Sequence, residues 1–101
     1  MPRDVLPQRR GGYTIQFRHW NMDFCATTGH YADGRLGEVF MSAGKLTSAT
    51  DTAIKEAAIA VSFALQFGAS LDDMRRAMPR TTAGEPEGPL GKLMDLLEQK
   101  S

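Results

Sequence analysis

The sequence contains a single cysteine, Cys25, and two histidines in 101 residues. One cysteine excludes an intramolecular disulfide and any metal site built only from cysteines. Long apolar runs are missing too, because the most apolar stretch, residues 57–67, is far shorter than the roughly 20 residues that span a bilayer. The first residues also lack the apolar core of a signal peptide. We therefore expect a cytoplasmic protein that does not contact a membrane.

An excess of charge of either sign is missing as well. The 12 basic residues balance 12 acidic ones, which argues against a nucleic-acid partner, because such proteins present a basic face. With 42% hydrophobic and 24% charged residues, the composition is that of an ordinary globular domain. Residues 1–12, which contain three arginines and two prolines, are expected to form a flexible basic tail, and residues 13–100 a single domain.

The longest helical pattern covers residues 48–68. Ser48 and Asp51 have the spacing of an N-terminal cap, and Gly68 is typical of a helix end. Apolar residues between them recur at the spacing of a helix face and spread sideways, so this helix must be covered on more than one side. The polar positions expected to face solvent are Lys55, Glu56, Ser62 and Gln66.

Strands are expected before this helix. Alternating apolar and polar residues predict strands over residues 13–18 and 22–28, joined by a short turn. Asp33-Gly34 has the composition of a two-residue type I′ hairpin turn, which requires positive φ at both residues. A third strand is expected over residues 35–41.

Two shorter helices are expected after the long one. Ser70 has the position of an N-cap, and Pro79 ends the first of these helices. Residues 80–88 have loop composition, and Pro89 begins the last helix. The order is therefore β-β-β-α-α-α, which indicates an α+β fold: a three-stranded antiparallel meander with helices on one face and the long helix packed on the sheet.

A three-stranded sheet leaves two edges exposed. We expect either a partner chain to complete the sheet, most simply in a homodimer, or charged side chains such as Arg18 and Arg35 to blunt its edges.

The turn before the long helix carries Gly44, Lys45, Thr47 and Ser48. Free backbone N–H groups, the helix dipole and a lysine are the parts of an anion site. The turn is not a Walker A loop, because the earlier glycine and the hydroxyl residue after the lysine are missing. The alternative is purely structural: the glycine makes the turn and the hydroxyls cap the helix.

A second candidate lies around Arg18, His19, Trp20 and His30, which could stack on a nucleobase and hold a phosphate; a polar turn with an aromatic at its edge is the alternative. Cys25 could be a nucleophile beside a histidine, but no orienting group is evident, and an inert thiol is favoured. No metal-ligand spacing or cofactor motif is present. The candidate ligand-binding residues are Gly44, Lys45, Thr47, Ser48, Arg18, Trp20 and Arg35.

Several short runs follow one another in a recognisable order: Asp33-Gly34-Arg35, Glu38-Val39-Phe40, Gly44-Lys45 and the helix end Ala64-Leu65-Gln66-Phe67-Gly68. With them, residues 13–98 resemble the TSCPD domain. That domain forms the C-terminal part of adenosylcobalamin-dependent (class II) ribonucleotide reductases and also occurs as short free-standing bacterial and phage proteins. The resemblance implies an α+β module associated with nucleotide metabolism.

The resemblance stops at the residues that give that family its name. The Thr-Ser-Cys-Pro-Asp signature is replaced by residues 87–92, without a cysteine, and the family's other cysteine would fall near residues 80–82 and is also absent. The large catalytic barrel of the reductases is absent as well, so we do not expect ribonucleotide reduction by this chain alone. The resemblance implies an accessory or regulatory protein that binds a partner protein or a nucleotide. A phage- or prophage-type protein that sequesters a nucleotide-like ligand or blocks a host factor is the alternative, and an independent enzyme is the weakest hypothesis.

Overall fold

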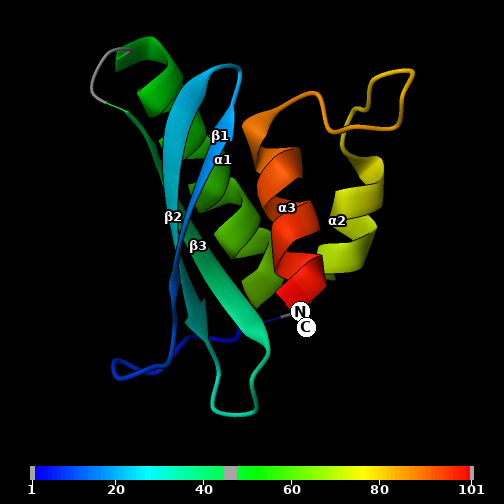
Figure 1. Cartoon of the computed structure of the whole chain (residues 1–101). Coiled ribbons are helices and arrows are strands. Elements are labelled where there is room, and N and C mark those ends of the chain that lie inside the picture. The colour runs from blue at the N-terminus through cyan, green and yellow to red at the C-terminus, as the bar shows by residue number, and fades with distance from the viewer. Residues whose placement is uncertain (1, 45–47, 101) are drawn as a thin grey trace.

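The computed structural model describes residues 2–44 and 48–100. It confirms an α+β fold of three antiparallel strands followed by three helices (Figure 1). The elements are β1 (Thr14–His19), β2 (Met22–His30), β3 (Leu36–Ala43), α1 (Ser48–Gln66), α2 (Leu71–Ala77) and α3 (Pro89–Lys100). The strands pair in the order β1-β2-β3. Within the described residues, no helix combines the length and apolar character needed to cross a membrane.

The two hairpins have different turns. His19 pairs with Met22 across the first hairpin, which leaves Trp20 and Asn21 as a two-residue turn. Both have positive φ, 54° and 57° respectively, which is the geometry of a type I′ turn. Two consecutive non-glycine residues in the left-handed region are uncommon, and the tight turn between paired strands imposes this geometry.

The prediction of a type I′ turn at Asp33-Gly34 is wrong. Gly34 has positive φ, 94°, but Asp33 does not. The second hairpin uses a longer connection. The N–H of Gly34 donates to the carbonyl of Tyr31 at 2.9 Å, and the N–H of Tyr31 donates to the carbonyl of Arg35 at 2.9 Å. Of Asp33 and Gly34, this turn needs positive φ only at Gly34, and glycine adopts that conformation at no steric cost.

The core lies between one face of the sheet and the helices α1 and α3. The predicted alternation is confirmed in β2, where Phe24 and Ala26 are buried. The buried hydrophobic residues of the core are Ile15, Phe24, Ala26, Val39, Met41, Ile54, Ala58, Val61, Leu65, Leu93, Met94 and Leu97. Gly68, with φ of 104°, ends α1 as expected, and the Ser70 hydroxyl caps α2 by accepting the N–H of Asp73 at 3.0 Å.

The outer edge of β3 is closed by polar side chains of α1. Ser62 Oγ accepts the N–H of Val39 at 2.9 Å and donates to its carbonyl at 3.0 Å. Gln66 Nε2 donates to the carbonyl of Gly37 at 3.0 Å. The expectation that Ser62 and Gln66 face solvent is therefore wrong: they are 9% and 5% exposed, because they satisfy backbone groups of the sheet edge.

Residues 2–12 have no regular secondary structure but contact the domain. The N–H of Asp4 donates to the carbonyl of Gln66 at 2.8 Å. The Arg10 guanidinium pairs with the carboxylate of Glu38, which is 8% exposed. Arg3 lies over the ring of Phe63, 4.4 Å from its centroid. The flexibility of this segment stays a prediction. The segment can move away from the domain only if these contacts break.

Candidate functional site

The face of the sheet opposite the helices carries a mixed row of side chains. Gln16 of β1 pairs with Cys25 of β2, and Cys25 pairs with Ser42 of β3. Because alternate residues of a strand point to opposite faces, these three side chains lie side by side across the sheet. Arg18 and Asp23 form the neighbouring pair toward the first hairpin turn.

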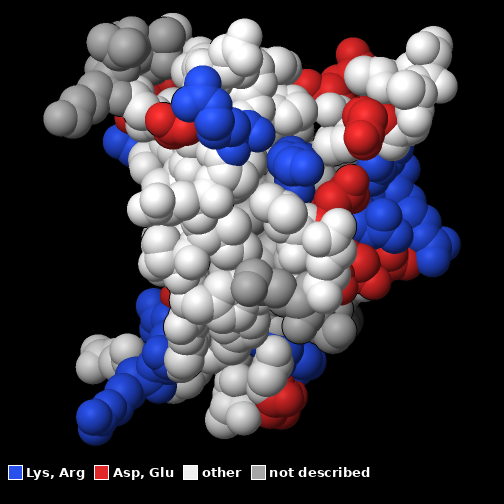
Figure 2. Space-filling model, viewed as in Figure 1, with Lys and Arg blue, Asp and Glu red and all other residues white. Residues whose placement is uncertain are grey.

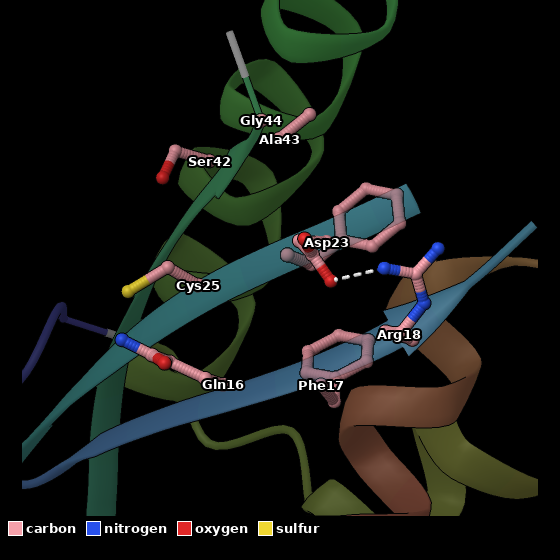
Figure 3. Close-up of a pocket in the computed structure, with 9 residues that line it drawn as sticks. Gln16, Phe17, Arg18, Asp23, Cys25, Ser42, Ala43 and Gly44 are labelled. Carbon is pink, nitrogen blue, oxygen red and sulfur yellow. Dashed lines mark hydrogen bonds and ion pairs between the residues drawn. The ribbon is translucent and has the colours of Figure 1, made fainter. Parts of the chain in front are cut away.

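A shallow depression of about 450 Å³ forms around this row. In Figure 3 the Gln16, Cys25 and Ser42 side chains project from the same side of the sheet. Arg18 Nη1 lies 2.9 Å from Asp23 Oδ1, and the N–H of Gly44 donates to the Asp23 carbonyl at 2.9 Å. The residues that line the depression are Gln16, Phe17, Arg18, Asp23, Phe24, Cys25, Ser42, Ala43 and Gly44.

The depression brings together two of the candidate ligand residues, Arg18 and Gly44. Lys45 and Thr47 lie outside the described residues, as does the side chain of Ser48. Of the predicted anion site, the structure therefore describes Gly44 and the backbone of Ser48.

The other two candidates lie elsewhere. Trp20 Nε1 donates to the carbonyl of Glu87 at 2.9 Å, so its ring is held against the loop before α3. Arg35 lies at the second hairpin, where Nε is 2.7 Å from Asp33 Oδ2 and Nη2 is 3.2 Å from Asp4 Oδ2. Hydrogen bonds with Asp33 and then Asp4 raise the pKa of Arg35, so this guanidinium is already paired within its own chain.

A negative charge lies close to the predicted anion site. Asp51 Oδ2 is 2.8 Å from Lys55 Nζ, and Oδ1 accepts the N–H of Ala43 at 2.9 Å. The hydrogen bond from Lys55, followed by that from Ala43, holds the pKa of Asp51 below its usual value. This carboxylate is therefore charged at neutral pH and opposes the binding of an anion beside Ala43.

The thiol of Cys25 has polar but not basic neighbours in the row. The two histidines are engaged elsewhere: His19 Nε2 lies 2.8 Å from the carbonyl of Glu87, and His30 Nε2 lies 3.0 Å from Thr28 Oγ1. The described residues also contain no group of three or more His, Cys, Asp or Glu side chains placed to hold a metal ion. What the row offers is an amide, a thiol and a hydroxyl side by side on an open surface.

Gln16 and Ser42 were missed by the sequence reasoning. Their proximity to Cys25 depends on the register of both strand pairs, which alternation alone does not fix. The signal that was available is the alternation of β2, which places Cys25 on the face away from Phe24.

Comparison with known proteins relates the chain to one enzyme. It is 41% identical over 88 residues to a vitamin B12-dependent ribonucleotide reductase of Bradyrhizobium diazoefficiens, and 36% identical over 86 residues to the reductase of the same description from Agrobacterium fabrum. The chain is similar to a small segment of vitamin B12-dependent ribonucleotide reductases. The matches cover 87% and 85% of this chain but only 7% of each reductase. No family model and no solved structure matches it.

The reductase-related region includes the loop between α2 and α3, where the signature cysteines of the resembled family are missing. Here the N–H of Thr81 donates to the carbonyl of Glu85 at 2.8 Å, so the loop folds back on itself. Arg80 Nη2 lies 2.7 Å from Asp95 Oδ1 of α3. The hydrogen bond from Arg80, opposed by partial burial and supported by Arg75, lowers the pKa of Asp95. An ion pair therefore fixes this loop to α3.

Proposed function

We propose that the chain is an accessory or regulatory module of the TSCPD type that associates with a vitamin B12-dependent ribonucleotide reductase and carries out no chemistry of its own. The observation that carries this proposal is the unequal coverage of the matches. They span 87% of this chain and 7% of the Bradyrhizobium reductase, so the shared part has the size of a single domain.

An exposed apolar row on α1 supports association with a protein. Ile59 and Phe63 of α1 and Phe67, directly after its end, are 54%, 45% and 46% exposed. The N–H of Phe67 donates to the carbonyl of Phe63 at 3.0 Å, so the four-residue spacing places all three on one side. Ile59 also lines a cavity of about 380 Å³ together with Phe40 of β3, which is 55% exposed. Contiguous exposed apolar side chains of this size are typical of protein contacts.

The test uses the purified Bradyrhizobium reductase in two forms, intact and lacking the segment that matches this chain. If the chain occupies the place of that segment, it binds the shortened enzyme roughly tenfold or more tightly than the intact one, in which the place is filled. Interferometry with the immobilised chain measures both affinities. No binding to either form would contradict the proposed association. Equal affinities would contradict binding at the place of the matching segment.

Matched variants show whether the apolar row makes the contact. Ile59→Glu places a charge in the row and should weaken binding at least tenfold, because burying an unpaired charge at an interface is costly. Thr82→Glu adds the same charge at an exposed position of the loop between α2 and α3 and should bind like the wild type. Circular dichroism confirms that both variants are folded.

The second candidate function is that of a phage-type binding protein that sequesters a nucleotide-like ligand. The observation that favours it is the convergence of Arg18 and Gly44 on the depression of the open sheet face. Calorimetric titration with linear and cyclic nucleotides tests it. Heat that disappears in Arg18→Gln would support this candidate, and absence of heat with every nucleotide would exclude it.

A further inference from the structure

Among the residues that the structure describes, no strand pairs with the outer edge of β1. The N–H of Thr28 donates to the carbonyl of Tyr13 at 2.9 Å, so Tyr13 turns its backbone groups toward β2. Because backbone direction alternates along a strand, Ile15 and Phe17 also face β2, and the N–H and C=O groups of Thr14, Gln16 and Arg18 point away from the sheet. β1 has no other strand beside it in the described structure.

The opposite edge of the sheet is closed. Ser62 and Gln66 of α1 bond the outward groups of Val39 and Gly37, and Asp51 bonds the N–H of Ala43. An added strand at β3 would have to displace α1 from these bonds. β1 is therefore the edge of this sheet that can accept a further strand.

The open edge is complementary to itself. If two β1 strands pair antiparallel about a two-fold axis at Gln16, Thr14 lies opposite Arg18 of the second copy, and Gln16 lies opposite Gln16. The two-fold axis also sets Arg18 opposite Thr14 of the second copy. Each of these three pairs exchanges two backbone hydrogen bonds, about six in all. No like charges meet, because Arg18 faces a threonine and is already paired with Asp23 at 2.9 Å.

The surroundings of the edge also suit a second copy. Figure 2 shows a face whose centre is largely uncharged, with lysine, arginine and acidic side chains gathered toward its rims. Phe17 is only partly buried and stacks on Phe24, with ring centroids 5.6 Å apart. In the paired arrangement, Ile15 of the second copy lies opposite Phe17 on the core side of the sheet and covers it.

We propose that two copies of this chain join through β1 about a two-fold axis at Gln16 and form a continuous six-stranded antiparallel sheet. Gln16 and Arg18 line the depression of the open face, so the two depressions meet at the axis. The Gln16 and Thr14 side chains of the second copy then extend each site. This inference is independent of any reductase, because it concerns the isolated chain.

Sedimentation equilibrium of the purified chain gives the first test, because the monomer has a mass of 11.1 kDa and the dimer twice that. Gln16→Lys sets two lysines opposite each other at the axis and should raise the dimer dissociation constant roughly tenfold. Thr27→Lys places a lysine on the same sheet face but on the central strand, where it is also exposed, and should leave the dimer intact.

Mixing identifies the axis itself. Gln16→Glu alone should also weaken the dimer, whereas an equimolar mixture of Gln16→Lys and Gln16→Glu should regain wild-type affinity as a heterodimer, since opposite charges then meet. A wild-type chain that stays monomeric up to several hundred micromolar overturns the proposal. A dimer that Gln16→Lys does not weaken, or a mixture that does not recover, overturns it equally.

Discussion

Ser62→Ala tests the closure of the sheet edge by α1. The Ser62 hydroxyl makes two hydrogen bonds with Val39, one to its N–H at 2.9 Å and one to its carbonyl at 3.0 Å. Val39 is 2% exposed and Ser62 is 9% exposed, so water cannot readily replace the hydroxyl. The alanine variant therefore leaves one backbone donor and one acceptor buried without a partner.

The magnitude follows from these two groups. A buried polar group left unpaired costs about 1–3 kcal/mol, and the alanine recovers about 0.5 kcal/mol through its better helix propensity. With both groups unpaired, the free energy of unfolding should fall by at least about 1.5 kcal/mol, which for a domain of this size lowers Tm by roughly 6–12 °C or more.

Urea unfolding followed by circular dichroism measures the change, with linear extrapolation to water. Thr52→Ala is the matched control, because Thr52 is an exposed position of the same helix and gains stability from the alanine alone. The two substitutions should therefore have opposite signs. If Ser62→Ala is as stable as the wild type, α1 does not close this edge in the way described.

Two further predictions concern the hairpins and the loop before α3. Asn21→Gly should raise the free energy of unfolding by about 0.5–1 kcal/mol, because Asn21 has positive φ. Asp33→Gly should lower the free energy of unfolding, because Asp33 lacks positive φ and its side chain accepts the N–H of Arg35 at 3.0 Å. Denaturant unfolding of the two variants measures both changes. The hydrogen bond from Arg80 is the largest cause of the lowered pKa of Asp95. The ionised carboxylate therefore stabilises the folded state fully above the ordinary carboxyl pKa of about 4. This stabilisation is lost as the pH falls through the lower folded-state pKa. Unfolding measured from pH 6 to pH 2 should therefore show a smaller acid loss in Arg80→Gln than in the wild type, and identical pH profiles would refute the role of this ion pair.

The fold was accessible from the sequence because its signals are local. Alternation in β2 assigns Phe24 and Ala26 to the core, and Gly68 marks the end of α1, where the structure has positive φ. These signals are the spacing of apolar side chains and the conformational preference of glycine, and both can be read from residues that are close in the sequence.

The errors arose where a tertiary partner decides the environment. Ser62 and Gln66 are polar residues of a helix, and only the position of α1 beside β3 gives them backbone partners. Asp33-Gly34 has a stronger type I′ composition than Trp20-Asn21, yet the strand register places the two-residue turn at the latter.

The sequence predicted part of the candidate site. Arg18 and Gly44 were singled out separately, and the register of three strands brings them to one depression. Gln16 and Ser42 carry no chemical signature of their own, so only the folded sheet reveals them beside Cys25.

The central claim is that this chain takes the place of one domain of a vitamin B12-dependent ribonucleotide reductase. The most direct test is the ratio of its dissociation constants for the intact Bradyrhizobium enzyme and for that enzyme without the matching segment. A ratio of about ten or more is predicted, because removal of the segment vacates the site. A ratio near one, or no measurable binding to either form, would contradict the claim.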